Sequence, residues 1–364
     1  MDWRRQADGC SHRSGRRPVQ ALRSLSASVG ADPLLVQGAG GNTSLKQNGL
    51  LWIKASGTWL MNAAASDIMV PVELAPLLEA VARRSPAAEK ADQFTPADLN
   101  PHRLRPSIET TVHALLPQNI VVHVHCVETI AAAVQANAEA LLAERLRGLD
   151  WAFVPYRRPG LPLAQGIAER LGPRTDVLVL GNHGLVVAGE TVAEASLLLR
   201  RVSGLLARPS RAAPAPDVDA LLRLAMGSDY RLPRAVEAHA AATDLVSCRI
   251  AASGSLYPDH VIFLGIGSVI AGPKENAAAV AARMSASGQP SPVSILFPGK
   301  GVLMRRDADA GAEAMARCLA DVAARIDPAA HVNYLSPQEN AELLNWDAEK
   351  YRQELNRRSG ASLQ

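Results

Sequence analysis

The chain has 364 residues, of which 48% are hydrophobic and 20% are charged, and its formal net charge is +3. This composition is that of an ordinary soluble protein with room for two modest domains, and it gives no indication of a nucleic-acid partner. The apolar stretches are short and interrupted by polar residues, so none reaches the ~20 residues of a membrane-spanning helix. Scattered cysteines without paired spacing predict reduced thiols and a cytoplasmic location. These cysteines are Cys10, Cys126, Cys248 and Cys318.

The N-terminal segment divides into a basic tail and a first helix. Residues 1–20 carry several arginines and no apolar core, so we expect a poorly ordered tail. Leu22, Leu25 and Val29 follow at helical spacing and predict a helix over residues 19–30. We place the first domain at residues 21–207.

A glycine-rich turn follows a predicted strand at residues 34–36. Its sequence, Gly38-Ala39-Gly40-Gly41-Asn42-Thr43-Ser44, lacks the G-x-G-x-x-G spacing and precedes another strand, which excludes a dinucleotide-binding fingerprint. Its backbone N–H groups, one amide and two hydroxyls suit an oxyanion or a phosphate, although a tight hairpin explains it equally well. A second strand, residues 50–55, ends in Ser56-Gly57, which would add donors for the same anion.

Residues 106–117 predict a short helix that carries a carboxylate. Ser107 is suited to be its N-cap, and Pro117 ends it. Glu109 then falls in the first turn, where it would either complement the helix dipole or face a site on the strand that follows.

That strand, residues 120–125, is an apolar run with two histidines. Because side chains alternate along a strand, His123 and His125 face the same way and are spaced to share one metal ion, unless both are core residues. A second apolar pair of strands, residues 176–187, is interrupted by Asn182-His183-Gly184, which places His183 at the end of a sheet. Three histidines with one open position are typical of catalytic zinc.

The second half of the chain predicts a smaller domain. A helix over residues 192–206 is followed by a linker rich in alanine and proline at 208–217. Residues 218–364 alternate between helix and strand and end in a helix from residue 336 to about residue 358, which favours a C-terminal α/β domain. We expect strands at 261–264, 293–297 and 301–304 and helices at 277–284 and 308–326. Asp259 and His260 are interpreted as a polar turn at a strand end, where a substrate could be contacted, although a plain loop is favoured.

Together these motifs resemble the class II aldolase/adducin family. Gly41-Asn42-x-Ser44, Ser56-Gly57, Pro106-Ser107-x-Glu109, His123-x-His125 and Asn182-His183-Gly184 occur in the order found in that family, over about residues 21–205. The surrounding sequence is most similar to the aldolase half of bifunctional rhamnulose-1-phosphate aldolase/short-chain dehydrogenase proteins. Gly265-Ile266-Gly267 is too bare to indicate a dehydrogenase domain.

The resemblance implies a fold and a set of functional residues. The fold would be an α/β/α sandwich around a central, largely antiparallel sheet, followed by the smaller α/β domain. His123, His125 and His183 would bind Zn²⁺ or another divalent transition metal, and Glu109 would be the catalytic acid/base. The substrate or phosphate pocket would be formed by Gly41, Asn42, Ser44, Ser56, Gly57 and Ser107. The resemblance also implies a homo-oligomer.

The implied reaction is cleavage of a ketose 1-phosphate, similar to rhamnulose 1-phosphate, into dihydroxyacetone phosphate and an aldehyde. Zinc would act as a Lewis acid that stabilises the enediolate, and the carboxylate would transfer the proton. The alternatives on the same metal site are a sugar-phosphate 4-epimerase and a 3-oxo sugar-acid phosphate decarboxylase. Two others are an adducin-like binding module without catalysis and a purely structural zinc. A binding module without catalysis has no reason to retain three histidines with Glu109. A structural zinc needs a fourth ligand, and no suitably spaced cysteine supplies one.

Two positions depart from the family's pattern. Ile108 replaces the second of two hydroxyls that often precede the glutamate, so one phosphate donor is missing. No tyrosine lies between Cys126 and Val154, where related enzymes carry the residue that protonates the leaving aldehyde. Tyr156 belongs to a different motif and is equally well explained as a packing residue, so the sequence assigns no proton donor.

Overall fold

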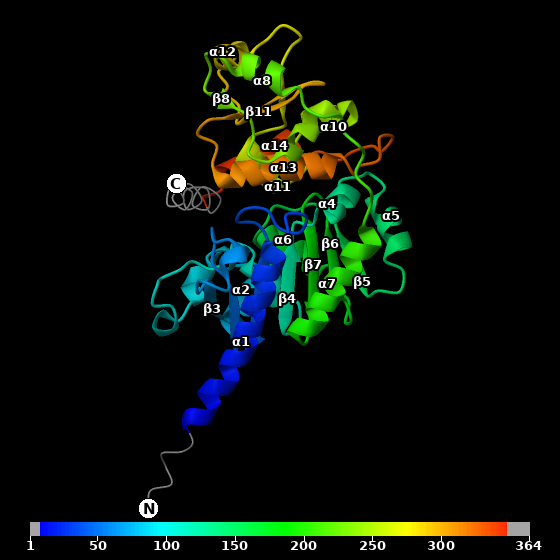
Figure 1. The fold of residues 1–364 in the computed structure, drawn as a ribbon. Helices are drawn as coiled ribbons and strands as arrows, with labels where there is room; N and C mark the ends of the chain where they lie inside the picture. The colour runs from blue at the N-terminus through cyan, green and yellow to red at the C-terminus, as the bar shows by residue number, and fades with distance from the viewer. Residues whose placement is uncertain (1–7, 348–364) are drawn as a thin grey trace, which may run out of the picture.

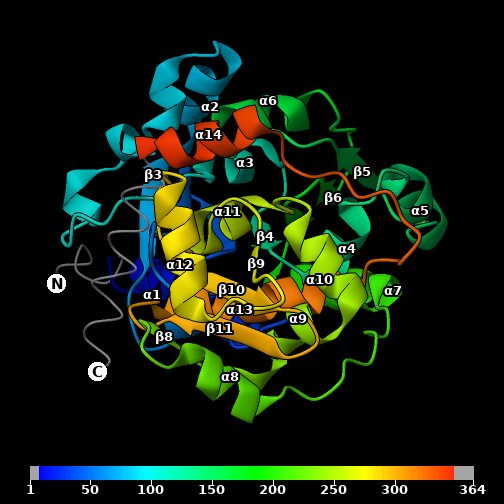
Figure 2. The same cartoon turned by 90° about the horizontal axis from the view of Figure 1, so that it is seen from above.

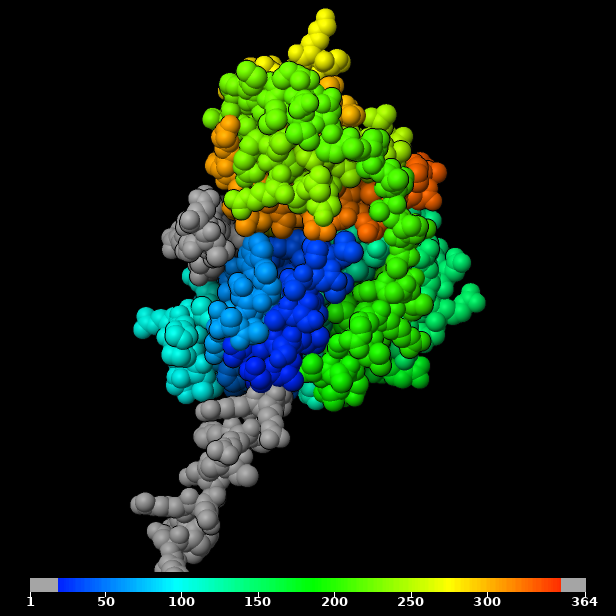
Figure 3. Space-filling model, viewed as in Figure 1, coloured from blue at the N-terminus to red at the C-terminus, as the bar shows by residue number. Residues whose placement is uncertain are grey.

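The structure is a computed structural model that describes residues 8–347, with side chains described from residue 19 onward. Two lobes are stacked in Figure 1, a lower one from the first half of the chain and an upper one from the second half. Figure 3 shows that their surfaces meet over a broad contact. No helix among the described residues is both long and apolar enough to cross a membrane.

The lower lobe is built on a seven-stranded sheet. Its strand order is β3-β2-β1-β4-β7-β6-β5, and every neighbouring pair is antiparallel except β5 with β6. The strands are β1 (Asn42–Gln47), β2 (Leu50–Lys54), β3 (Met69–Glu73), β4 (Ile120–Val124), β5 (Trp151–Val154), β6 (Val177–Leu180) and β7 (Gly184–Gly189). The predicted central, largely antiparallel sheet is confirmed.

Helices cover both faces of this sheet. They are α1 (Asp8–Gly30), α2 (Leu74–Ala82), α3 (Thr110–Leu115), α4 (Val127–Ala133), α5 (Ala138–Arg145), α6 (Leu161–Ala168) and α7 (Val192–Leu206). The β4 side chains alternate between the two faces: Val122 and Val124 pack in the core formed with α1, α5 and α7, whereas Val121 packs in the core formed with α3 and α6. The lobe is therefore the expected α/β/α sandwich, and His123 projects toward the α3 side.

The upper lobe contains a smaller sheet with the strand order β8-β11-β10-β9. Its strands are β8 (Tyr230–Arg231), β9 (Val269–Ile270), β10 (Ser294–Phe297) and β11 (Gly301–Arg305). Its helices are α8 (Val218–Ala225), α9 (Ala240–Thr243), α10 (Leu245–Ala252), α11 (Pro258–Leu264), α12 (Ala277–Ala286), α13 (Ala310–Ala323) and α14 (Pro337–Asn345). Helices α8 and α12 lie on the outer face of the sheet, and α13 lies on the face toward the lower lobe (Figure 2).

The two lobes share one hydrophobic core. Val127, Ile130 and Val134 in and beside α4 belong to the same apolar cluster as Val261 of α11 and Leu319 of α13. The connection at residues 207–217 has no regular secondary structure. It is nevertheless fixed in place, because the Arg211 guanidinium donates to the carboxylate of Asp244 at 2.9 Å and to the carbonyl oxygen of Ala323 at 2.6 Å.

Several predicted element bounds are corrected by the structure. The expected strand at 261–264 is wrong, because these residues form the end of α11, all of whose residues are buried. Residues 34–36 form a turn and not a strand. Helix α1 begins at Asp8, ahead of the predicted start at residue 19, and residues 1–7 of the predicted tail lie outside the described residues. The closing helix ends at Asn345, and its predicted continuation from residue 348 also lies outside them.

Candidate metal centre

Two of the predicted ligands lie at the end of β4, in the middle of the sheet: His123 is in the strand, and His125 is the first residue after Val124, where the strand ends one residue earlier than predicted. The ring centroids of His123 and His125 are 5.0 Å apart, and both side chains are buried. The register of β4 places His123 between Asn42 of β1 and Val186 of β7. Residues opposite one another across antiparallel strands project to the same face, so Asn42 is on the histidine side of the sheet.

His183 reaches the same point from the turn between β6 and β7. Its ring centroid lies 4.9 Å from that of His123 and 5.2 Å from that of His125. The next residue, Gly184, packs so closely on β4 that a Cβ there would lie 2.4 Å from the carbonyl oxygen of Val124. Only glycine therefore allows this turn to approach β4 and bring the third histidine to the site.

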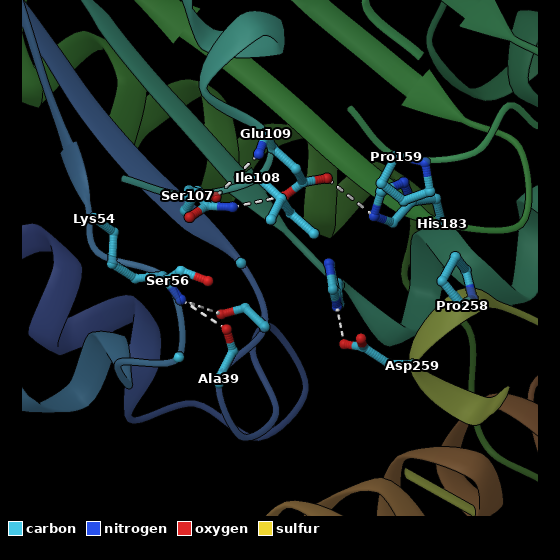
Figure 4. Close-up of a pocket in the computed structure, with 15 residues that line it drawn as sticks. Ala39, Lys54, Ser56, Ser107, Ile108, Glu109, Pro159, His183, Pro258 and Asp259 are labelled. Atoms are coloured by element: carbon cyan, nitrogen blue, oxygen red, sulfur yellow. Dashed lines mark hydrogen bonds and ion pairs between the residues drawn. The ribbon is translucent and has the colours of Figure 1, made fainter. Parts of the chain in front are cut away.

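Glu109 completes the cluster from the segment before α3. It occupies the N-cap position of α3, which begins at Thr110, so the predicted first-turn position of Glu109 and N-cap position of Ser107 are both wrong. The Ser107 hydroxyl still accepts a hydrogen bond from the backbone N–H of Glu109 at 3.2 Å. The carboxylate of Glu109 accepts a hydrogen bond at Oε2 from Asn42 Nδ2 at 2.6 Å. Its Oε1 lies 3.3 Å from His183 Nε2 (Figure 4). The same atom lies 3.5 Å from His123 Nε2.

The four side chains fit a divalent metal ion. One potential ligand atom from each of Glu109, His123, His125 and His183 lies within 4.8 Å of all the others. Three of the facing atoms, Glu109 Oε1, His123 Nε2 and His125 Nε2, are buried without a hydrogen-bond partner in the described structure. Orphaned buried polar atoms cost free energy, so three at one point indicate a site formed for a ligand. Three imidazoles and a carboxylate are a donor set that zinc prefers.

The charge state of the cluster also suits a cation. Burial raises the pKa of the Glu109 carboxyl, but Coulombic attraction to the neighbouring histidines in their protonated form lowers it to about 2. A cation bound among neutral histidines would favour the carboxylate in the same way. Burial lowers the pKa of His123, and it lowers the pKa of His183 to about 3, so both rings are neutral. Neutral imidazole is the form of histidine that binds a metal.

A pocket at the cluster contains most of the predicted substrate-binding residues. It is lined by Gly41, Asn42, Ser56, Gly57 and Ser107, and also by Ala39, Gly40, Lys54, Ile108, Glu109, His125, Pro159, His183, Pro258 and Asp259. The turn that carries Ser56 and the segment that carries Ser107 are held side by side, because Ser56 N donates to Arg105 O at 2.9 Å and Ser107 N donates to Lys54 O at 3.0 Å. The free volume is about 20 Å³, enough for an ion or a water molecule. A sugar phosphate would require the lining to move apart.

A family model described as the class II aldolase and adducin N-terminal domain matches residues 22–205. The chain belongs to the class II aldolase/adducin family. A curated relative, the uncharacterized oxidoreductase YuxG of Bacillus subtilis, is 31% identical over an alignment of 196 residues that covers 50% of this chain and 28% of that protein. The chain thus covers well under two thirds of this relative's length.

Solved structures also match the chain over its first half. One is the N-terminal class II aldolase domain of a conserved Thermoplasma acidophilum protein, with 26% identity, a TM-score of 0.45, and coverage of 51% of this chain and 90% of that one. Another is L-fuculose-1-phosphate aldolase from Thermus thermophilus, with 18% identity, a TM-score of 0.36, and coverage of 52% and 91%. A third is YgbL from Klebsiella pneumoniae, a putative aldolase/epimerase/decarboxylase, with 21% identity, a TM-score of 0.36, and coverage of 52% and 87%.

One predicted residue of the family pocket, Ser44, is not brought to the site. Strand β1 already begins at Asn42, so Thr43 and Ser44 are strand residues and not part of the glycine-rich turn. The Ser44 hydroxyl hydrogen-bonds His113 Nδ1 at 2.8 Å, and Thr43 Oγ1 hydrogen-bonds Ser26 Oγ at 2.6 Å. Both hydroxyls that the sequence offered for anion binding are therefore used inside the protein.

Two charged residues of the pocket are not predicted from the sequence motifs. Lys54 is 2% exposed, and its Nζ donates to the carbonyl oxygens of Ala39 at 2.7 Å and Thr58 at 2.9 Å. It therefore connects the glycine-rich turn to the turn that follows β2. Asp259, interpreted as part of a polar loop, instead lies in the first turn of α11 and contacts His125. No local pattern could reveal this contact, because its two partners belong to different lobes.

The two departures from the family pattern are visible in the pocket. Ile108 lines it at the point where relatives often present a hydroxyl. Tyr156 does not line it and packs against the core shared by the lobes. Within one chain, Tyr156 is therefore a packing residue.

Gly40 lies against the contact between His125 and Asp259. A Cβ at this position would be 2.8 Å from His125 Nδ1 and 3.1 Å from Asp259 Oδ2. We expect Gly40→Ala to displace this contact and to weaken zinc binding by about 10–100-fold, the usual cost of disturbing a partner of a metal ligand. Competition with a chromophoric chelator measures the change.

The matched control is Gly204→Ala in α7, where an added Cβ meets nothing within 4 Å. It should leave zinc affinity unchanged and stabilise the helix by up to about 1 kcal/mol. Equal zinc affinity in the two variants would contradict the assigned role of Gly40.

Proposed function

We propose that this chain is a metal-dependent aldolase that cleaves a ketose 1-phosphate, similar to rhamnulose 1-phosphate, into dihydroxyacetone phosphate and an aldehyde. The observation that carries the proposal is the convergence of Glu109 and three histidines beside a pocket rich in hydrogen-bond donors. Family membership supports a metal site of this kind, and the substrate and the reaction are our own proposal.

The anion pocket supports a phosphorylated substrate. Ser56, Ser107, Gly41 and Lys54 all line the same cavity, and Lys54 Nζ already donates to the carbonyl oxygens of Ala39 and Thr58. Hydroxyl and backbone N–H donors gathered at one cavity favour a phosphate over a neutral hydroxyl group. The phosphate would therefore bind between the glycine-rich turn and the turn that carries Ser56, and the carbon chain would extend toward the histidines.

The chemistry follows from the charge state of the side chains. His123, His125 and His183 would hold the ion, which when bound supplies Lewis-acid polarisation of the ketose oxygens. Asn42 donates to Glu109 Oε2 and so holds the carboxylate with Oε1 toward the site. In the cleavage direction, the C4 hydroxyl loses its proton as the C3–C4 bond breaks and the aldehyde departs, and Glu109 carries the proton that is returned to C3, so no net proton is gained or lost. Proton transfer by a positioned carboxylate contributes about 10²–10⁴-fold to the rate.

A decarboxylase of a 3-oxo sugar-acid phosphate is the second candidate, and one observation favours it. Aldol cleavage requires a base that removes the proton of the C4 hydroxyl as the aldehyde forms, whereas loss of carbon dioxide from a carboxylate requires no such step. No tyrosine lines the pocket of the described chain, so this step has no assigned residue. The adducin-like alternative is disfavoured because it leaves the three orphaned ligand atoms unexplained.

A product assay separates these reactions. The zinc-loaded protein is incubated with rhamnulose 1-phosphate, fuculose 1-phosphate, the unphosphorylated ketoses, ribulose 5-phosphate and a 3-oxo sugar-acid phosphate. We expect dihydroxyacetone phosphate from a ketose 1-phosphate, and a kcat/KM about 100-fold lower, or lower still, for its unphosphorylated form. Release of carbon dioxide without dihydroxyacetone phosphate would identify a decarboxylase instead of an aldolase. Formation of an epimer without dihydroxyacetone phosphate would identify an epimerase. Equal rates with and without the phosphate would refute the anion pocket.

A further inference from the structure

The upper lobe supplies a side chain to the metal centre of the lower lobe. Asp259, near the start of α11, is 2% exposed, and its Oδ2 lies 2.9 Å from His125 Nδ1. Figure 4 shows its carboxylate directed from the upper lobe toward the histidines. Helix α11 is itself fixed by packing against α13 and α14, so the carboxylate is held on a rigid support.

This contact bears on which ring nitrogen of His125 is available to bind a metal ion. A carboxylate oxygen this close to Nδ1 favours the His125 tautomer that carries its proton on Nδ1 and leaves the lone pair on Nε2. His125 Nε2 is the atom left without a partner beside Glu109 and His123. His123 is oriented in the same manner, because its Nδ1 donates to the carbonyl oxygen of Leu185 at 3.0 Å. The two ligands of β4 are thus oriented from different lobes.

A second contact ties the upper lobe to the third histidine. Asn182, which precedes His183, has a φ of +52° and occupies the left-handed region. Its Nδ2 donates to Leu256 O at 2.9 Å and to Asn333 O at 2.7 Å, and both acceptors belong to the upper lobe. The upper lobe therefore holds both His125 and the turn that carries His183.

We propose that Asp259 is a positioning residue for the metal ligand His125, and that the upper lobe is consequently part of the metal centre. The proposal rests on the metal site of the proposed function and not on the reaction. Because coupling between two equilibria is reciprocal, an ion that binds more tightly when α11 is docked also holds α11 more firmly in place. Metal should then slow amide exchange in residues 256–264 of the upper lobe.

The test compares Asp259→Asn with Asp244→Asn, the same substitution at a carboxylate of the upper lobe that pairs with Arg211 and lies outside the pocket. We expect Asp259→Asn to weaken Zn²⁺ binding by about 10–100-fold and to shift the absorption bands of bound Co²⁺, with no such changes in Asp244→Asn. Zinc should slow amide exchange at residues 256–264 in the wild type and less so in Asp259→Asn. Unchanged zinc affinity and an unchanged Co²⁺ spectrum in Asp259→Asn would overturn the proposal.

A double-mutant cycle separates positioning from general loss of structure. If Asp259 acts through His125, Asp259→Asn should have no further effect on zinc affinity in a His125→Ala background. An equal fold-change in both backgrounds would overturn the positioning role. These readouts involve metal binding alone, so a protein that shows them but cleaves no sugar phosphate would refute the aldolase proposal and leave this one standing.

Discussion

Glu109→Gln is expected to lower kcat/KM for cleavage of the ketose 1-phosphate by about 10²–10⁴-fold, because the amide cannot carry the proton that is returned to the substrate carbon. Metal content should stay near one ion per chain, since three histidines suffice to hold zinc. The glutamine oxygen can still accept the hydrogen bond that Asn42 donates to the carboxylate, so the local structure should be retained. Steady-state kinetics and metal analysis on the same preparation measure both quantities.

The matched control for this variant is Glu128→Gln. Glu128 lies in α4 and pairs with Arg325 at 2.8 Å, away from the pocket lining. Its substitution breaks a buried ion pair and should destabilise the protein while leaving kcat/KM close to that of the wild type. Wild-type cleavage by Glu109→Gln would show that another group moves the proton, and loss of metal in that variant would show that Glu109 is an essential ligand.

His123→Ala should abolish the stabilisation that zinc confers on the fold. An ion that binds only the folded chain, at about 1,000 times its Kd, adds about 4 kcal/mol to the free energy of unfolding. His123 lies in the central strand and faces Glu109 with an otherwise unpartnered Nε2, so its removal deletes a ligand and leaves the others incomplete. We therefore expect urea denaturation of the variant to be nearly the same with zinc and with a chelator.

His113→Ala is the corresponding control. His113 is also buried on this side of the sheet, but its Nδ1 is bonded to Ser44 Oγ, and it is not a member of the ligand cluster. The substitution should lower the stability of the metal-free protein and retain the increment due to zinc. If zinc raised the free energy of unfolding of His123→Ala as much as that of the wild type, the ligand assignment would be contradicted. Loss of this zinc-dependent increase in His113→Ala would contradict it as well.

The parts of the site that could be predicted from sequence are those fixed by local periodicity. Alternation along β4 is sufficient to place His123 and His125 on one face, and Asn182-His183-Gly184 marks the end of β6. The long amphipathic helix α7 follows in the same way from its apolar spacing. The antiparallel character of the sheet was implied by the family resemblance and is confirmed by the strand pairing.

The parts that could not be predicted depend on long-range packing. Residues 261–264 are β-branched and aromatic in part, and α11 is buried on every side, so it lacks the polar face that identifies a helix in a sequence. Ser44 lies on the histidine face of β1 but opposite Val121, one step away from the site, where its hydroxyl meets His113. Asp259 reaches His125 only because the upper lobe packs on α4, and no sequence spacing records that packing.

The most direct test of the account is to restore zinc in steps to chelator-treated protein while recording aldehyde release from the ketose 1-phosphate. We expect no aldehyde release without metal. The rate of release should rise linearly with added zinc up to about one equivalent per chain and stay constant beyond it. Release that is independent of metal would contradict the assignment of Glu109 and the three histidines as a catalytic metal centre. Binding of one equivalent without any product from a sugar phosphate would contradict the proposed aldolase reaction.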